Sequence, residues 1–273
     1  DVIALQEIQD DSAETDDTVV TADATLQMLI DSIVLAGGPE YEAFNVEPAN
    51  NTQGGAPGGN IRNAFLYNPD RVALVDYFAL DAAVLLAAGA DPTAFDGTRI
   101  PLVGVFEFNG KKFTAISVHN SSRFGSTPIF GGPQPFIQAG EEAREAQTSA
   151  LNQYVDFLLG ADPDARVMVA GDFNTFEFTD ELLEDMTGPE PALTNLVPIH
   201  DNGPDQGNHF GQEDFYSFIF DGNSQMLDHF FVTDNLLGTA EFDIVHVNVD
   251  FPRVDPSFGS DHEPLVARFS LNG

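Results

Sequence analysis

Apolar residues run without interruption over residues 167–170 and stop at Gly171, after which come Asp172, Phe173 and Asn174. A short apolar run closed by a glycine is typical of a buried strand that ends in a tight turn. The two-residue period of a strand places Asp172 and Asn174 on one side and turns Phe173 into the core. A carboxylate and a carboxamide there can orient a phosphate, a metal ion or a water molecule, and an ordinary Asx turn is the alternative interpretation.

Continuous or alternating apolar character predicts further strands along the chain. They fall at residues 1–8, 101–108, 112–119, 215–220, 226–232, 244–249 and 265–269. Asn109-Gly110 separates two of these runs and is a strong signal for a hairpin turn. Residues 61–75 contain two apolar runs on either side of Asn68-Pro69-Asp70, which predicts a second hairpin.

Helical spacing of apolar positions predicts helices at residues 22–36 and about 140–159. Arg144 lies on the second helix among Glu141, Glu142 and Glu145, so we expect an ordinary ion pair on the helix surface. The Ala-, Gly- and Asp-rich residues 79–98 predict a mobile connection. Neither an internal repeat nor a clear linker divides the chain, so we expect one domain.

Composition supports a packed protein with an unusual surface. The chain has 273 residues, of which 42% are hydrophobic and 24 are Phe, enough for a large core. No run of eighteen apolar residues occurs, so no membrane span is expected. The chain has no Cys, which removes disulfide and thiol chemistry. The first residues already have strand character, so the N-terminus is expected to be a processing boundary that is compatible with secretion.

Charge is the most unusual bulk property. Lys and Arg number 10 and Asp and Glu number 44, for a net charge of −34. The acidic residues are spread along the chain, and their mutual repulsion destabilises a folded protein in dilute buffer but is screened by salt. We therefore expect an acidic shell adapted to high salt or to abundant divalent cations.

Several polar residues share a position at, or just beyond, the end of an apolar strand. They are Glu7, His119, Asp172 and Asn174, while Asp261 and His262 come just before the last strand. Asp228 is embedded in an apolar run and requires a partner, because a buried carboxylate is costly when unpaired. A histidine is the natural partner, because a carboxylate orients and charges an imidazole.

The remaining histidines are expected to be structural or on the surface. His229 faces away from Asp228 on the same strand, and we expect a structural role for it. The sequence offers no partner for His200, His209 or His246.

Four segments together resemble, in order, the signature of the endonuclease/exonuclease/phosphatase superfamily, whose fold is that of pancreatic deoxyribonuclease. They are Gln6-Glu7, Gly171-Asp172-Phe173-Asn174, Leu227-Asp228-His229 and Ser260-Asp261-His262. Three further segments are similar to bacterial extracellular nucleases: Gly59-Asn60-Ile61-Arg62, Arg99-Ile100-Pro101-Leu102, and Val118-His119 with Arg123. The resemblance implies an α+β fold over residues 1–273, a four-layer αββα sandwich with two mixed β-sheets packed face to face and flanked by helices.

The resemblance also implies metal-assisted phosphoester hydrolysis. Glu7 and Asp261 are then expected to hold Mg²⁺ or Mn²⁺, hard cations that prefer carboxylate oxygens. His262, polarised by Asp228, is expected to activate the attacking water as a base or to contact the phosphate.

Further roles follow from the same resemblance. Asp172 and Asn174 are expected to position the nucleophile and a phosphate oxygen. His119 is expected to protonate the leaving oxygen or to stabilise charge that develops in the transition state.

Arginine is scarce, and three arginines lie beside strand ends near these residues. Arg62, Arg99 and Arg123 are candidate substrate-binding residues, because a guanidinium can hold a phosphate through two hydrogen bonds. Local ion pairs with the abundant Asp are the alternative for each.

The chain departs from the family pattern in two places. It begins at the Gln-Glu strand, so the family's first strand and helix are expected to be missing. Ile61 stands where pancreatic-type relatives have a Glu that pairs with the histidine, so His119 is expected to lack that orienting acid.

Taken together, these features predict a secreted or cell-surface DNA endonuclease, monomeric, largely non-specific and adapted to high salt, with RNA as a second candidate substrate. One alternative is a phosphodiesterase or phosphatase for a small phosphoester. The other is an inactive surface domain that binds structural Ca²⁺, which the acidic loop at residues 10–17 favours.

Overall fold

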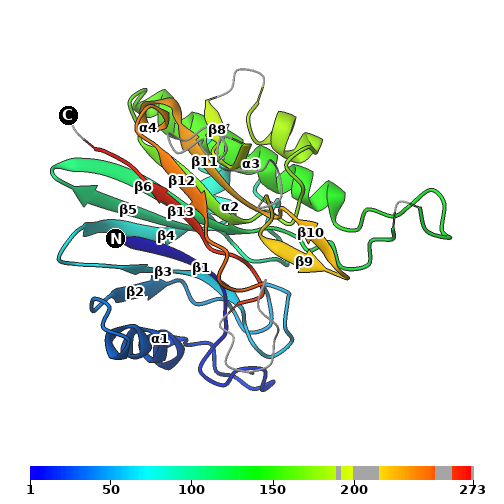
Figure 1. The fold of residues 1–273 in the computed structure, drawn as a ribbon, viewed down its shortest axis with the longest axis horizontal. Helices are drawn as coiled ribbons and strands as arrows, with labels where there is room; N and C mark the ends of the chain where they lie inside the picture. Colours follow the sequence, from blue (N-terminus) through cyan, green and yellow to red (C-terminus); the bar gives the residue numbers. More distant parts are fainter. Residues whose placement is uncertain (129, 189–191, 199–214, 250–259, 272–273) are drawn as a thin grey trace.

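Residues near the N-terminus form a three-stranded antiparallel sheet in the order β1 (Val2–Ile8), β3 (Arg62–Tyr67), β2 (Glu42–Asn45). The computed structural model describes residues 1–128, 130–188, 192–198, 215–249 and 260–271 (Figure 1). Helix α1 (Asp23–Leu35) covers the outer face of this sheet, where its Leu26 and Ile30 pack against β3. Because β3 is central and covered on both faces, it is buried along its whole length.

A larger, mixed sheet packs against the first. Its six strands are β4 (Ala73–Ala79), β5 (Leu102–Phe108), β6 (Lys111–His119), β7 (Val167–Asp172), β11 (Asp228–Thr233) and β8 (Leu193–Asn195), in that order across the sheet. Strands β6 and β7 are parallel and the other pairs are antiparallel. A parallel pair requires a crossover, which α3 (Glu141–Ala161) supplies. The carboxyl ends of β6 and β7 and the start of β11 therefore meet at one edge of the sheet.

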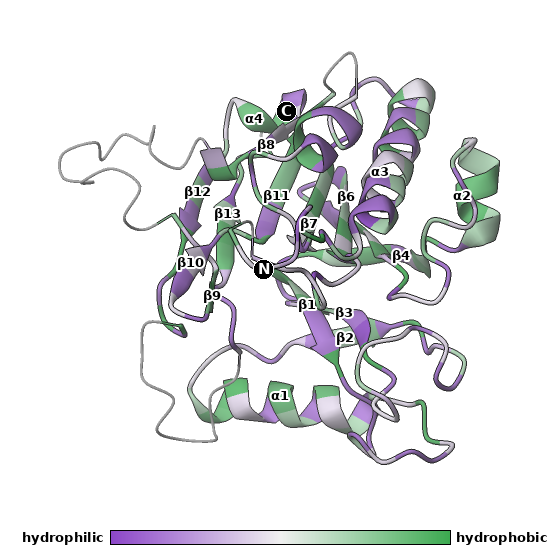
Figure 2. Cartoon of the chain, turned by 90° about the vertical axis from the view of Figure 1, so that its right-hand side faces the viewer, coloured by the Kyte–Doolittle hydropathy of each residue, from purple (hydrophilic) through white to green (hydrophobic). Residues whose placement is uncertain are grey.

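Two apolar layers hold the sandwich together. Between the sheets lies an aromatic layer of Phe44, Phe65, Tyr67, Phe106 and Phe113. A larger core lies between the mixed sheet and its helices α2 (Ala82–Ala88) and α3. Figure 2 shows the order of the layers, with α1 below the small sheet and α3 and α2 on the far side of the large one. The predicted α+β, four-layer αββα sandwich is confirmed.

Two antiparallel ribbons and two short helical elements are the remaining elements of the described residues. The ribbons are β9 (Phe218–Phe220) with β10 (Asn223–Gln225), and β12 (Glu241–Ile244) with β13 (Leu265–Arg268). The short π-helix η1 (Glu181–Asp185) follows β7, and α4 (Asp234–Leu237) follows β11. None of the described helices has the length and apolar character needed to cross a membrane.

The hairpin at residues 109–110 is confirmed, and the one at residues 61–75 is wrong. Strands β3 and β4 belong to different sheets, and the chain passes from one to the other at Asn68. Because β3 is a central strand, both of its edges are already occupied by β1 and β2.

Two other segments also differ from the prediction. Residues 79–98 contain α2, which begins after Asp81, whose carboxylate accepts two backbone N–H groups, and ends at Gly89 with φ 81°. The last predicted strand but one, at residues 244–249, instead ends at Ile244. Beyond it, the backbone N–H groups of residues 247–249 donate to the buried carboxylate of Glu263, which replaces a strand partner.

Candidate active site

The carboxyl ends of β6 and β7 and the start of β11 bring the predicted polar residues together. Asp172 is in register with His119 on one side and with Asp228 on the other. The Asp172 carboxylate accepts hydrogen bonds from the backbone N–H of Asn174 (2.7 Å) and from its side-chain Nδ2 (2.8 Å). Phe173 is fully buried between them, as the alternation predicts. The Asx turn and the polar pair are therefore one structure.

Asp228 has the histidine partner that its burial requires. His262 Nδ1 donates to Asp228 Oδ2 at 2.6 Å, which leaves Nε2 as the ring nitrogen directed away from that carboxylate. Burial alone would lower the pKa of His262, but the charge and hydrogen bond of Asp228, with smaller effects of Asp172 and Asp261, raise it to about 10. The ring is therefore an imidazolium at neutral pH.

Asp172 is the acid of this cluster that titrates near neutrality. Burial raises the pKa of Asp172, the charge of Asp228 raises it further, and the result is about 7. Arg99 is buried close to this carboxylate and donates to the backbone oxygen of Asn120 at 2.6 Å. Burial lowers the pKa of Arg99, and the charges of Asp172 and Glu7 oppose that shift.

His119 lies between two acids, although Ile61 stands where the resemblance to pancreatic-type relatives led us to expect a Glu. Its Nε2 is 3.5 Å from Asp172 Oδ2 and 3.7 Å from Glu7 Oε1. Burial lowers the pKa of His119 well below its usual range, and the positive charges of Arg99 and His262 add to this effect. The ring is therefore neutral, and within the described residues its Nδ1 has no hydrogen-bond partner.

Glu7 reaches the site from the other sheet through a β-bulge. The register of β1 against β3 shifts between Leu5 and Ile8, and Glu7 itself has φ 57°, in the left-handed region. Its side chain is 65% exposed. A bulge redirects a side chain, and here it turns a strand-end carboxylate toward His119.

Gln6, to which the sequence assigned no role, joins the two sheets. Its Nε2 donates to Ser117 Oγ at 2.9 Å, two residues before His119. Gly171 leaves room for this contact, because a Cβ there would lie 2.2 Å from the backbone oxygen of Val118 and 3.0 Å from Gln6 Nε2. Gln6 and Glu7 therefore have different roles. Gln6 connects β1 to β6, and Glu7 places a carboxylate near His119.

The donor chemistry fits a hard divalent cation. Within the described residues no group of three or more His, Asp or Glu is arranged to hold a metal ion. Mg²⁺, however, is usually bound by one or two carboxylates and completes its shell with water and phosphate oxygens. The exposed carboxylate of Glu7 meets that requirement, and Asp261 is near enough to act on the charge of His262.

The three candidate substrate arginines lie in different surroundings. Arg99 is in the cluster, and the guanidinium of Arg123 lies over the ring of Phe176, 4.3 Å from its centroid. Arg62 is buried and donates to backbone oxygens of Asn60 (3.0 Å) and Val20. Arg99 and Arg123 are therefore placed beside the site, whereas Arg62 holds N-terminal loops together.

In the acidic loop, Asp10 and Asp11 accept hydrogen bonds from N–H and O–H groups of the protein itself. Asp10 is buried and accepts from Asn60 Nδ2 (2.8 Å) and from the backbone and side chain of Ser12 (2.9 Å each). Asp11 accepts from Thr21 (2.7 Å) and from the backbone of Thr25 (3.0 Å). These carboxylates serve as internal hydrogen-bond acceptors of the loop.

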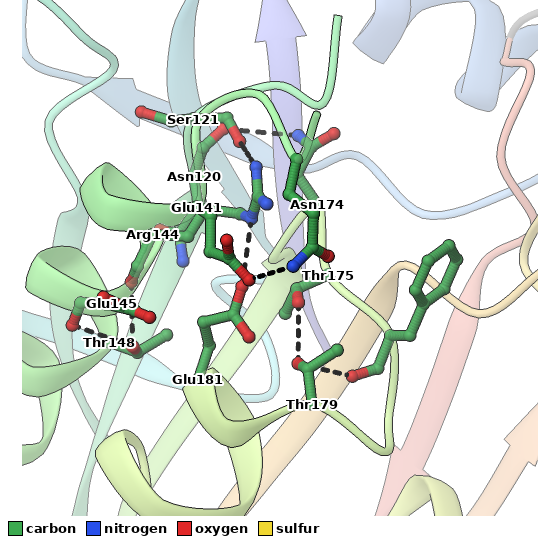
Figure 3. Close-up of polar contacts among 12 residues, drawn as sticks. Asn120, Ser121, Glu141, Arg144, Glu145, Thr148, Asn174, Thr175, Thr179 and Glu181 are labelled. Carbon is green, nitrogen blue, oxygen red and sulfur yellow. Dashed lines mark hydrogen bonds and ion pairs between the residues drawn. The ribbon is translucent and has the colours of Figure 1, made fainter. Parts of the chain in front are cut away.

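Arg144 is fully buried, so the predicted surface ion pair is wrong. Figure 3 shows its contacts with Glu181 and Ser121. Its Nε is 3.6 Å from Glu181 Oε1, and its NH1 donates to the backbone oxygens of Ala139 (2.9 Å) and Ser121 (3.3 Å). One turn further along α3, Gln147 accepts from the backbone of Ser121 (2.9 Å) and donates to its hydroxyl (3.0 Å).

These contacts hold the turn that follows His119. In that turn the backbone oxygen of Asn120 accepts from Arg99 (2.6 Å) and from Asn174 Nδ2 (3.2 Å). Arg144 and Gln147 also share a helix face with the buried Leu151, and that spacing was the signal in the sequence.

The other histidines divide as follows. His229 is buried and bonded to Asn195 (3.0 Å) and to the backbone oxygen of Thr175 (3.1 Å), and burial lowers its pKa to about 4. This is the structural role predicted for it. His246 does have a partner, because its Nδ1 lies 3.7 Å from Glu263 Oε1. His200 and His209 lie outside the described residues.

The chain is similar to known proteins both in sequence and in structure. A sequence model of the Endonuclease/Exonuclease/phosphatase family matches residues 1–262. No curated protein sequence matches the chain. Among solved structures, TDP2 from D. rerio complexed with single strand DNA product has a TM-score of 0.58 at 15% identity, over 97% of this chain and 84% of that one.

Two further solved structures have a similar fold. The human nocturnin catalytic domain with bound sulfate has a TM-score of 0.57 at 17% identity, over 99% of this chain and 80% of that one. A mannosyl-6-phosphatase from Bacteroides thetaiotaomicron has a TM-score of 0.56 at 18% identity, over 99% of this chain and 85% of that one. At these identities the likenesses show a shared fold.

Proposed function

The chain belongs to the endonuclease/exonuclease/phosphatase family of phosphoester hydrolases, and from that premise we propose that it is a metal-dependent phosphodiesterase that cleaves nucleic acid. The observation that carries the proposal is the meeting of the Asp228–His262 pair, the Asp172–Asn174 pair and His119 at one strand edge. A base, a cation and a hydrogen-bond donor within one cluster are the groups that phosphoester hydrolysis requires.

Asp172 is the proton acceptor in this proposal. Its pKa of about 7 lets it take a proton from a water molecule at neutral pH, and Asn174 holds the carboxylate in place. The role of base that the resemblance implied for His262 requires a neutral ring, whereas Asp228 keeps this ring protonated. We therefore assign His262 the other role, contact with a phosphate oxygen through Nε2–H.

His119 and Arg99 act on the charge that develops during the reaction. Because the His119 ring is neutral, we assign it a hydrogen bond from Nε2 to a phosphate oxygen rather than proton donation to the leaving group. Arg99 lies behind the same cluster and contributes fixed positive charge. Glu7 and Asp261 would hold Mg²⁺ or Mn²⁺, which supplies Lewis-acid stabilisation of phosphate oxygens.

The substrate we propose is DNA, with RNA as the second candidate, cleaved without strong sequence preference by a secreted or cell-surface monomer in high salt. The DNA in the structure of the similar TDP2 supports nucleic acid as the substrate class. The net charge of −34 supports action in high salt, where repulsion between protein and phosphates is screened.

The test is cleavage of supercoiled plasmid at 0.1 and 2 M NaCl with Mg²⁺, Mn²⁺ or a chelator. We expect metal-dependent nicking that persists in high salt and is abolished in His262→Ala. Hydrolysis of bis(p-nitrophenyl) phosphate, a small phosphodiester, reports the chemistry without nucleic-acid binding. Nicking by His262→Ala at the wild-type rate contradicts the mechanism.

The small number of basic residues favours one second candidate, a phosphatase or phosphodiesterase for a small phosphoester. With 10 Lys and Arg in the whole chain, contacts that neutralise a long polyanion are few. Hydrolysis of small phosphoesters without any cleavage of plasmid or oligonucleotide would select this candidate.

A further inference from the structure

A stack of side chains extends from Arg123 toward solvent. The Arg123 guanidinium covers one ring face of Phe176, and Phe178 stacks on that ring with centroids 5.4 Å apart and planes at 16°. Phe178 is 65% exposed. Phe176 lies two residues after Asn174 in the sequence, which places this stack next to the site.

A second stack extends from His262. The ring centroids of Phe218 and His262 are 4.7 Å apart with planes at 32°, and those of Phe218 and Phe220 are 6.4 Å apart with planes at 15°. Phe220 is 57% exposed. Both phenylalanines are on β9, where the two-residue period places them on one face, and pairing with β10 holds that face in position.

The two stacks share one design. Each begins at a basic residue of the site, continues through a half-buried Phe and ends at a Phe ring that is mostly exposed. Exposed phenylalanine rings are unfavourably hydrated, and paired rings with nearly parallel planes are suited to continue the stack with a further planar group.

We propose that Phe178 and Phe220 are stacking platforms for unpaired nucleobases, so that the preferred substrate is single-stranded nucleic acid. This inference rests on the proposed phosphodiesterase function. Base–aromatic stacking binds any base through its π face and therefore does not depend on sequence. In a duplex the base faces are covered by neighbouring bases and are not available to a protein ring.

Charge makes this source of affinity necessary. Most proteins gain affinity for nucleic acid by neutralising phosphates with Lys and Arg, and that gain falls steeply with salt. Here acidic residues outnumber basic ones 44 to 10, so the electrostatic contribution from the protein surface is repulsive. Stacking is uncharged, and we expect binding of single strands to hold or improve between 0.1 and 2 M NaCl.

The test is the binding of fluorescein-labelled oligothymidylate, followed by anisotropy in chelator so that no cleavage occurs. The comparison ligands are an abasic strand of equal length and a blunt duplex. We expect the base-bearing single strand to bind at least about tenfold more tightly than the abasic strand or the duplex. Phe178→Ala and Phe220→Ala should each lower the affinity for the base-bearing single strand about tenfold. Phe178→Trp keeps a ring and should retain wild-type affinity.

Phe157→Ala is the matched control, because Phe157 is 47% exposed and stacks on Tyr154 in helix α3, on the outer layer. It should bind the single strand as the wild type does. Equal affinity for base-bearing and abasic strands, or identical behaviour of Phe178→Ala and Phe157→Ala, overturns the proposal. Melting temperatures confirm that each variant is folded.

Failure of this inference can be told apart from failure of the proposed function. If bis(p-nitrophenyl) phosphate and DNA are hydrolysed but binding shows no dependence on bases, the stacking proposal alone is overturned. If neither is hydrolysed while Phe178→Ala weakens binding of the single strand, the platforms stand and the proposed activity is overturned.

Discussion

Replacing Arg144 by Met should destabilise the protein strongly although α3 is an outer helix. Met is about as long as the apolar stem of Arg, so the packing of that stem is kept while the guanidinium and its charge are lost. The variant leaves the carboxylate of Glu181 buried without its partner at 3.6 Å, and it leaves the backbone oxygens of Ser121 and Ala139 without their donor.

The expected cost is about 3–5 kcal/mol, the range for breaking a buried ion pair by removing one partner. The two hydrogen bonds to backbone oxygens are part of the same network, so their worth is not added separately. For a chain of this length the loss corresponds to a fall in melting temperature of roughly 10 °C.

Urea unfolding followed by circular dichroism at constant high salt measures this cost. Arg144→Met/Glu181→Leu should recover part of the loss, because it removes the uncompensated charge as well. Arg268→Ala is the control, since Arg268 forms an exposed pair with Glu241 at 3.4 Å that is worth less than about 1 kcal/mol. An Arg144→Met cost no larger than that of Arg268→Ala would refute the reasoning.

Four further outcomes are expected. The kcat/KM for bis(p-nitrophenyl) phosphate should rise with pH through about 7 as Asp172 loses its proton. In Asp172→Asn the kcat/KM should fall at least about 100-fold and its pH dependence should disappear. A variant with the wild-type pH profile contradicts the assignment. Glu7→Gln should need more than about tenfold more Mn²⁺ for half-maximal rate at an unchanged melting temperature, because a neutral amide is a weaker ligand; an unchanged metal requirement counts against Glu7. Gly171→Ala should lower the melting temperature and kcat together, because its Cβ would meet Val118 and Gln6, and a variant that melts like the wild type disproves the close contact. The melting temperature should rise from 0.1 to 2 M NaCl as the net charge of −34 is screened, and no dependence on salt refutes the halophilic interpretation.

Local signals carried most of the successful predictions. Asn109-Gly110 determines a turn by its own backbone preferences, and β5 and β6 follow from it. Asp228 predicted a partner because an unpaired carboxylate buried in an apolar run is energetically costly. His262 is that partner. In both cases the signal is local in the sequence, although the partner of Asp228 lies 34 residues away.

The failures have non-local causes. The neighbours of β3 are β1 and the four-residue β2, and nothing near Asn68 encodes that choice. Arg144 looked like a surface residue because its neighbours in sequence are glutamates, whereas its buried partner Glu181 lies 37 positions away in η1. Gln6 and Ser117 meet only because two sheets pack together.

The division of the site between two sheets has a mechanical consequence. Glu7 belongs to one sheet and the His119 cluster to the other, so the aromatic layer and the Gln6–Ser117 bond determine how the two halves are aligned. A slip of one residue along a strand would displace Glu7 by about 3.3 Å, more than a metal ligand tolerates. Heating should therefore stop turnover before it unfolds the protein. Substitutions such as Phe65→Leu, deep between the sheets, should widen the interval between the temperature of inactivation and that of melting.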